Sequence, residues 1–173
     1  QDNNGVELRA HPVLLNNEAI LSTLKGVRNG IEVDTDLIGK IHIAGSGAGQ
    51  ESTASGLISD IIHLASCDLN QLSNFSASIK EIKITDFNKI FFRNYFYLEA
   101  DDNPGVMASI TSLVASHSIG IDTIIQKDKL TDNLVPVFFI TDECEELHAS
   151  KLVSEFSKMN IIKKVKRIRV ESD

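Results

Sequence analysis

The sequence predicts an α+β fold, in which a βαββαβ unit follows a shorter segment of mixed α/β structure. Two periodicities lead to this prediction. Apolar residues alternate with other residues in several short stretches, as expected for strands, and recur every three to four residues in longer stretches, as expected for amphipathic helices. In the second half of the chain these stretches follow the order βαββαβ, which typically forms a four-stranded antiparallel sheet with both helices on one face.

The first part of the chain contains three predicted strands and one predicted helix. Strands are expected at 6–9, 31–33 and 41–44, with the turn residues of DTDLIGK between the last two. One apolar stripe predicts a helix from residue 53 to about residue 66, with the hydroxyl of Ser52 as its N-cap. The stripe comprises Ala54, Leu57, Ile58, Ile61, Ile62 and Ala65.

Residues 67–90 are rich in Ser and Asn and show no sustained period. This composition is typical of a connector, and it leaves room for at most one short strand, at 79–84. We therefore expect a domain boundary here.

The βαββαβ unit begins with an alternating strand at 95–100. The helix after it is bounded by Asn103 as N-cap, Pro104 as first helical residue and Gly120 just beyond the end. Its stripe is Val106, Ile110, Leu113, Val114 and His117. The remaining elements are strands at 120–127 and 135–142, a helix that turns Ala149, Leu152, Val153 and Phe156 inward, and a strand at 163–171.

Two strands of this unit do not alternate cleanly. Ile124 stands beside Ile125, and Phe138 stands beside Phe139. A strand with one face in water keeps polar residues on that face. We therefore expect the second face or an edge of the sheet to pack on another copy of the chain.

Composition excludes several classes of partner. The net charge of −7 argues against nucleic acid, and the basic run at 163–169 is interpreted as a strand with one wet face. No apolar stretch approaches the roughly 20 residues that span a bilayer. Cys67 and Cys144 lack the spacing of metal ligands, so reduced thiols, a cytoplasmic location and no metal site are expected.

Three glycines, Gly45, Gly47 and Gly49, lie between a predicted strand and the helix after it. Without side chains, they let backbone amides approach a phosphate or a nicotinamide ring. The GSGAGQ segment lacks the GxGxxG spacing of a dinucleotide-binding turn, so a tight structural turn is the alternative. His11 likewise is either an acid–base group or a structural histidine.

The DDNPG segment offers a second candidate site. An acidic side chain at the start of a helix accepts from an ammonium group, while the amides of the helix face a carboxylate. One turn, from Asp101 to Gly105, thus presents both polarities that a free amino acid needs. A plain capping turn is the alternative.

Two stretches resemble one family of enzymes. DDNPGVMASITSLVASHSIGIDTIIQ resembles the opening of an ACT domain, a small amino-acid-binding regulatory module. GVELRAHPVLL, LSTLKGVRNGIEV and GSGAGQESTASGLISDII resemble the end of the catalytic region of homoserine dehydrogenase. The chain is therefore similar to the C-terminal portion of that family, with residues 1–66 as the end of the catalytic domain, 67–92 as a connector and 93–173 as an ACT domain.

This resemblance implies an oxidoreductase of threonine, methionine and isoleucine biosynthesis. The complete enzyme would reduce L-aspartate 4-semialdehyde to L-homoserine with NADPH or NADH, and Gly45, Gly47 and Gly49 would contact the cofactor. No catalytic residue is assigned to this chain. The nucleotide-binding domain and the catalytic lysine are expected outside it, so the chain alone is expected to be inactive.

The ACT resemblance implies an amino-acid effector, threonine first, for feedback regulation. The effector would lie between the ACT domains of a homodimer or homotetramer. Its expected contacts are Asp102, Asn103, Gly105 and Val106 from the first turn, with Ile119, Gly120, Ile121 and Asp122 from the start of the second strand. A stand-alone amino-acid-binding module acting in trans is the alternative to an enzyme.

Overall fold

The computed structural model describes residues 5–66, 83–131 and 133–171. The chain forms two compact units, of which the first combines residues 1–14 with 82–173 and the second comprises residues 15–81. The domain boundaries at residues 66 and 92, which follow from the resemblance, stay a prediction.

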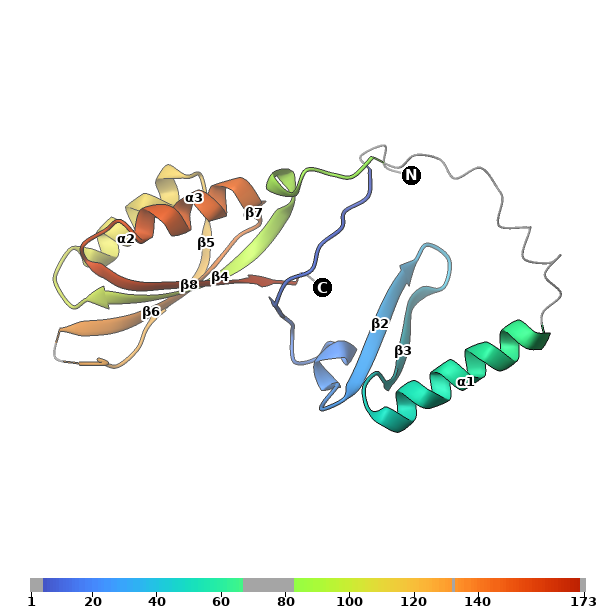
Figure 1. The fold of residues 1–173 in the computed structure, drawn as a ribbon. Helices are drawn as coiled ribbons and strands as arrows, with labels where there is room; N and C mark the ends of the chain where they lie inside the picture. The colour runs from blue at the N-terminus through green and yellow to red at the C-terminus, as the bar shows by residue number, and fades with distance from the viewer. Residues whose placement is uncertain (1–4, 67–82, 132, 172–173) are drawn as a thin grey trace. The chain divides into compact units, whose positions relative to one another are not determined.

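The first unit is built on one sheet, in which the main strands run in the order β1-β8-β4-β6-β5 (Figure 1). The strands β4, β5, β6 and β8 pair antiparallel, whereas the short β1 runs parallel to β8. A two-residue strand, β7, pairs with the start of β4. The bounds are β1 Val13–Leu14, β4 Phe91–Asp101, β5 Ile121–Gln126, β6 Leu134–Thr141, β7 Cys144–Glu145 and β8 Ile162–Val170.

Helices α2, Val106–Ser116, and α3, Glu146–Phe156, lie on the same face of this sheet (Figure 1). The core lies between the helices and the sheet, and Phe96 stacks on Phe139 with ring centroids 4.7 Å apart. Phe156 of α3 packs edge-on against both rings. The mixed α+β class and the order βαββαβ are confirmed, with β7 and the short helix η3, Phe87–Lys89, as additions.

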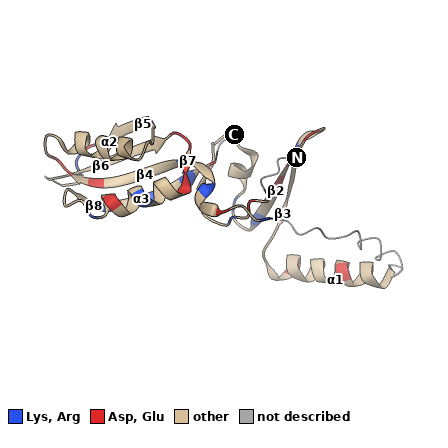
Figure 2. Cartoon of the chain, turned by 90° about the horizontal axis from the view of Figure 1, so that it is seen from above, with Lys and Arg blue, Asp and Glu red and all other residues tan. Residues whose placement is uncertain are grey.

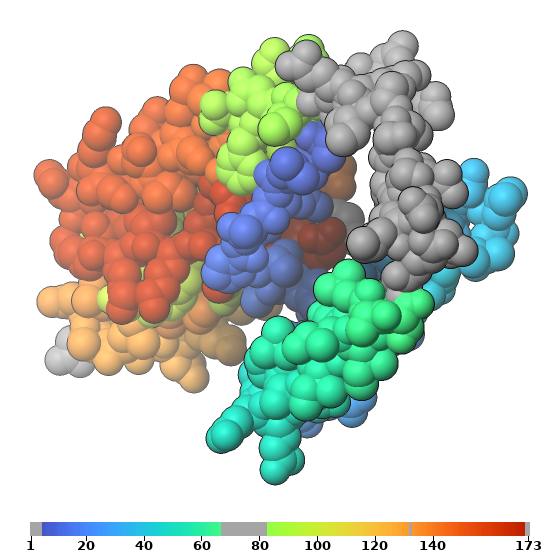
Figure 3. Space-filling model, turned by 45° about the vertical axis from the view of Figure 1, so that its right-hand side comes forward, coloured from blue at the N-terminus to red at the C-terminus, as the bar shows by residue number. Residues whose placement is uncertain are grey.

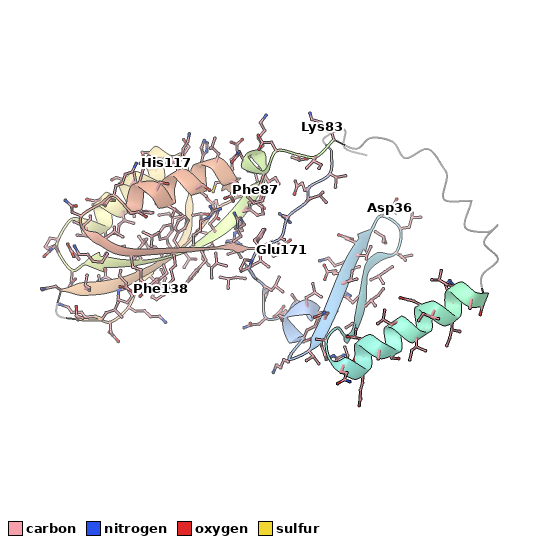
Figure 4. All side chains as sticks on the ribbon, in the orientation of Figure 1. Asp36, Lys83, Phe87, His117, Phe138 and Glu171 are labelled. Atoms are coloured by element: carbon pink, nitrogen blue, oxygen red, sulfur yellow. The ribbon has the colours of Figure 1, made fainter. Side chains whose placement is uncertain are left out.

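The opposite face of the sheet carries aromatic side chains that helices do not cover. Tyr95 and Tyr97 of β4 lie beside Phe138 of β6, with ring centroids 6.2 and 5.2 Å from it. Figure 4 shows Phe138 on the side of the sheet away from α2 and α3. Ile125 of the edge strand β5 pairs with Phe138 and is half exposed. The broken alternation in these strands therefore corresponds to an apolar open face.

The predicted ends of α2 are wrong. The N-cap is Gly105, not Asn103, and Pro104 precedes the helix. The amide of Val106 donates to the carbonyl of Asn103 at 3.2 Å, and Gly105 has φ +90° and ψ −12°. These angles fit the third position of a type II turn, where proline favours the second position and glycine the third. The turn chemistry therefore outweighs the capping preference of asparagine.

The other end of α2 also differs from the prediction. The helix ends at Ser116, and Ser118, with φ +57°, takes the left-handed conformation that commonly follows a helix. Gly120 lies two residues further on, where a Cβ atom would fall 2.1 Å from Oδ2 of Asp142. Its lack of a side chain serves this close approach rather than the helix end.

The second unit contains a β-hairpin and a helix. Strand β2, Arg28–Thr35, pairs antiparallel with β3, Gly39–Ser46, and both contain the strands predicted there. Helix α1 spans Gln50–Ser66 and therefore begins before Ser52, so the predicted N-cap is wrong. A short helix, η1, Ile20–Thr23, precedes the hairpin.

The apolar side chains of this unit are largely exposed. The helix α1 buries none of its residues, and Leu57, Ile58, Ile61 and Ile62 each expose more than half of their surface. The apolar face of the hairpin, including Ile31 and Ile43, is exposed as well. No described helix is long and apolar enough to cross a membrane.

The strand predicted at 6–9 is wrong. Only Val6 pairs there, in an isolated parallel bridge to Ile84. Ile84 is also the end of the strand predicted at 79–84, of which residues 79–82 lie outside the described residues. Cys144 is a buried free thiol, and Cys67 lies outside the described residues.

Candidate functional site

The glycine turn connects β3 to α1, as the sequence predicts. Gly49 has φ +114°, in the region that side chains rarely adopt. A Cβ atom on Gly47 would fall 1.8 Å from Nδ2 of Asn29, so the amide side chain of Asn29 fills the space beside the turn. The carbonyl of Gly49 accepts from the amide and the hydroxyl of Thr53, at 3.1 and 2.9 Å. The backbone conformation therefore favours glycine at Gly49, and the side chain of Asn29 occupies the space that a side chain at Gly47 would need.

Gly45 differs from the other two glycines. It lies within β3, opposite Asn29, and a Cβ atom built on it would meet nothing within 4 Å. Its backbone conformation does not require glycine either, because its φ is not positive. A methyl group at Gly45 would therefore fit without displacing another described residue.

A charged group on the hairpin was missed by the sequence analysis. Nε2 of His42 lies 2.7 Å from Oε2 of Glu32, and Nζ of Lys40 lies 3.0 Å from the other carboxylate oxygen. The hydrogen bonds from Lys40 and then His42 lower the pKa of Glu32. His42 and Glu32 are directly opposite each other in the hairpin, so the register of the strands would have revealed the pair.

The turn after β4 contains the predicted amino-acid site. Oδ2 of Asp102 lies 2.5 Å from Nζ of Lys129, and the amide of Asp102 donates to the carbonyl of Asn133 at 2.9 Å. Val106 is buried at the start of α2, whereas Asn103 and Gly105 are exposed. Lys129 thus occupies the carboxylate that was predicted to bind an ammonium group.

The other predicted effector residues lie at the far end of α2. Ile119 is buried, and Asp122 forms an ion pair of 2.7 Å with Arg93. The eleven residues of α2 separate the two groups by about 16 Å at 1.5 Å per residue. The Asp102–Gly105 turn and the 119–122 segment are therefore not brought together within one chain.

His11 belongs neither to the Asp102–Gly105 turn nor to the 119–122 segment. Its Nδ1 is 3.0 Å from the carbonyl of Pro12, and its Nε2 is shielded from solvent without a hydrogen-bond partner. The ring packs edge-on against Phe92, with centroids 5.6 Å apart. This packing favours a structural histidine. In the described part of the chain, no group of three or more His, Cys, Asp or Glu is placed to hold a metal ion.

Three comparisons with known proteins agree on one family. A family model described as homoserine dehydrogenase matches residues 3–62. The homoserine dehydrogenase of Helicobacter pylori is 32% identical over 96% of this chain, and that of Neisseria gonorrhoeae is 28% identical over 97%. The crystal structure of a homoserine dehydrogenase from Thiobacillus denitrificans superposes with a TM-score of 0.81 and 27% identity, over 98% of this chain.

The chain belongs to the homoserine dehydrogenase family. It spans about 40% of the length of these relatives. The match to the homoserine dehydrogenase model takes in the β2–β3 hairpin, the glycine turn and most of α1. The resemblance noted in the sequence is therefore confirmed at the level of the family.

One further cluster of charged residues in the chain was not predicted. The buried carboxylate of Glu146, in the first turn of α3, accepts hydrogen bonds from Arg167 and Arg169 of β8 and from Ser150, at 2.6–2.9 Å. Figure 2 shows acidic and basic residues close together where β7 leads into α3. Nε of Arg167 also donates to the buried Asn94 at 2.7 Å.

This cluster corrects the interpretation of the basic run. The strand at 162–170 is confirmed, but the side chains of Arg167 and Arg169 expose only 10% and 20% of their surface. Burial raises the pKa of Glu146, yet the hydrogen bonds from Arg167, Arg169 and Ser150 outweigh it and lower the pKa to about 2. The two arginines therefore face an internal carboxylate rather than water.

Proposed function

We propose that the complete protein containing this chain reduces L-aspartate 4-semialdehyde to L-homoserine with NADPH or NADH. In this proposal residues 1–66 form the end of the catalytic domain, and residues 93–173 form an ACT regulatory domain. The observation that carries the proposal is the glycine turn from Gly45 to Gly49, set within a segment that matches the homoserine dehydrogenase family.

The glycine turn would contact the nicotinamide end of the cofactor, which supplies a hydride to the aldehyde carbon when bound. The turn itself would hold the nicotinamide ring in place. Gly49 holds the backbone in a shape that side chains disfavour, Gly47 leaves room for the side chain of Asn29, and Gly45 leaves open space beside it. The catalytic lysine and the remaining cofactor contacts would lie outside this chain, so the 173-residue chain alone is expected to be inactive.

The regulatory part of the proposal rests on the turn after β4. An amino-acid effector would present its ammonium group to Asp102 in place of Lys129, and its carboxylate to the amides at the start of α2. Because the 119–122 segment lies at the other end of α2, both groups would meet only across two copies of the chain. Effector coupling of this kind is typically worth about 1–3 kcal/mol.

The surface of the first unit supports an assembly of two or four copies through the ACT domains. Strand β5 forms an edge of the sheet, and its neighbour β6 presents Phe138 on the open face. An exposed edge strand and an uncovered apolar face are both surfaces on which a second copy commonly pairs. Sedimentation of the chain, with Ile125→Lys as a variant that charges the edge, would measure this association. A monomer at all concentrations would contradict it.

The catalytic proposal is tested by Gly49→Val in the complete enzyme. A branched side chain at φ +114° distorts the turn, so kcat/KM for the aldehyde is expected to fall at least tenfold with a higher KM for the cofactor. Gly56→Val is the matched control, because Gly56 lies within α1, its φ is not positive, and a Cβ atom there meets nothing within 4 Å. Unchanged kinetics in Gly49→Val would mean that the turn is only structural.

The regulatory proposal is tested by calorimetry of the chain with threonine, isoleucine and methionine. At least one is expected to bind in the micromolar to millimolar range, and Asp102→Asn should weaken that binding tenfold or more. Lys151→Gln, on the exposed side of α3, is the control for a change of charge. Heats of dilution alone for all three amino acids would remove the regulatory function and leave the catalytic one standing.

A further inference from the structure

A cavity of about 920 Å³ lies in the first unit, and its lining shares no residue with either candidate site. Its walls come from residues 5–9, from residues 83–92 and from the end of β8 with Glu143. The cavity is at the Phe91 end of β4, whereas the Asp102 turn follows the other end. Ten residues of extended strand separate these ends by about 30 Å. The cavity is therefore distinct from the proposed effector site.

The N-terminal segment forms one wall because it is fixed at two points. At one point, the amide of Val6 donates to Lys83 at 2.8 Å, and the amide of Thr85 donates back to Val6 at 3.0 Å. At the other, β1 pairs with β8, and the amide of Glu171 donates to Leu14 at 3.0 Å. Between these points residues 7–12 pair with no strand in the described part of the chain.

Figures 3 and 4 show the course of this wall. In Figure 3 the N-terminal segment, in dark blue, lies against the yellow-green residues that follow residue 82. Figure 4 labels Lys83 and Glu171, which lie at the two points where the segment is attached. Gly5 allows the close approach at the first point, since a Cβ atom there would fall 2.3 Å from the carbonyl oxygen of Lys83.

The walls carry both signs of charge and leave cations unpaired. Lys83 and Lys89 form no ion pair with another described residue. The guanidinium of Arg9 lies over the ring of Phe92 at 4.9 Å, and it forms long ion pairs with Glu7 at 3.9 Å and with Glu171 at 3.5 Å. Arginine carries five N–H donors, so most of its hydrogen-bonding capacity remains available.

Apolar surface lies beside these charges. Phe91, Phe92, Ile84 and Val170 all line the cavity. Binding sites for small molecules typically combine such apolar walls with a few polar groups and have volumes of roughly 300–1,000 Å³. A ligand that matches this cavity needs an anionic group, a cationic group and an apolar body.

We infer that this cavity binds a free α-amino acid with a large apolar side chain. Its carboxylate faces Lys83, Lys89 and Arg9, and its ammonium group faces Glu7 and Glu171. Its side chain lies against Phe91 and Ile84, which line the cavity and are both more than half exposed. Because the ligand touches the N-terminal segment and the end of the sheet together, binding stabilises the attachment of residues 5–9 to the rest of the unit.

The test uses the 173-residue chain labelled with ¹⁵N and L-phenylalanine as the probe. Amide shifts at residues 5–9, 83–92 and 170–171 are expected to change and saturate with a Kd in the micromolar to millimolar range. N-acetyl-L-phenylalanine and L-phenylalanine methyl ester each lack one charge, so both should bind at least tenfold more weakly. Equal binding of these analogues, or no saturable change at these residues, overturns the inference.

Two variants separate this site from the proposed effector site. Lys89→Gln should weaken binding at least tenfold, whereas Lys151→Gln should leave it unchanged. Gly5→Val should also weaken binding, because its side chain displaces the wall while every charge remains. Unchanged tyrosine fluorescence of each variant shows that the sheet is intact. Shifts confined to residues 102–106 and 119–122 would overturn the cavity site and leave the effector proposal standing.

Discussion

The guanidinium of Arg167 meets the carboxylate of Glu146 through two hydrogen bonds, of 2.9 and 2.6 Å. Arg169 adds two more to the same carboxylate, and its guanidinium also lies over the rings of Phe87 and Phe92 at 5.1 and 5.2 Å. This arrangement ties the start of α3 to β8, η3 and β4. The stability of the first unit should therefore depend strongly on one carboxylate.

Replacing that carboxylate should destabilise the first unit. Glu146→Gln leaves two buried arginines without their counter-charge, which typically costs about 3–5 kcal/mol in the free energy of unfolding. Urea denaturation measures this, with tyrosine fluorescence as the signal, since both tyrosines of the chain lie in β4. Glu155→Gln is the control, because its carboxylate is exposed and its contact with Nε2 of His117 contributes at most about 1 kcal/mol. Similar losses for both variants would contradict the prediction.

Acid should remove the same contribution. The pKa of Glu146 is about 2 in the folded chain against an ordinary value of 4.5. Because the folded pKa is the lower one, the stabilisation is fully present above about pH 4.5 and is lost as the pH falls toward 2. The difference in stability between the wild type and Glu146→Gln should therefore shrink across this window. A difference that stays constant from pH 5 to pH 2.5 would show that the carboxylate does not act through its charge.

The turn before α2 should require glycine. Gly105 has φ +90° and open space around its Cα, so Gly105→Ala introduces backbone strain without a clash. The expected loss is about 1–2 kcal/mol in the free energy of unfolding. Ser109→Ala, one turn into the same helix, removes only a hydrogen bond to the carbonyl of Gly105 and should change stability by less than about 0.5 kcal/mol. Equal stability of Gly105→Ala and the wild type would argue against the type II turn.

The loss of stability on replacing a phenylalanine should depend on how deeply its ring is buried. Phe156 is fully buried between Phe96 and Phe139, and Phe156→Ala should cost about 3–5 kcal/mol in the free energy of unfolding. Phe91 is 57% exposed, and Phe91→Ala should cost about 1 kcal/mol or less. Urea denaturation of the two variants measures this difference, provided that both transitions have the same m-value. A larger loss for Phe91 would place the main core elsewhere.

The periodicity of the sequence was sufficient to predict the βαββαβ order from β4 to β8, but not the short strands β1 and β7. Leu152 and Phe156 are buried as the helical stripe predicted, and the alternation in β4 places Phe96 and Leu98 in the core. The ends of helices were less predictable because several residues compete for one role. Asn103 has the chemistry of an N-cap, but the Pro104–Gly105 pair imposes a turn that starts the helix later.

The candidate sites also differ in how well the sequence predicts them. The glycine turn and the Asp102 turn are local features, so consecutive residues were enough to locate them. The Glu146 cluster joins residues 21 and 23 positions apart, and the cavity joins residues 5–9 to 83–92. No local pattern marks such pairings, because each residue on its own has the properties of an ordinary surface charge.

The pairing of β1 with β8 matters for any attempt to prepare residues 83–173 alone. A shortened chain that begins at residue 83 lacks Val13 and Leu14, which occupy the outer edge of β8 near its end. The carbonyl and amide groups of that edge would then be open to strands of other molecules, and intermolecular sheet formation is the usual result of such exposure. Retaining residues 5–14, joined to residue 83 by a designed linker, should keep such a protein in solution.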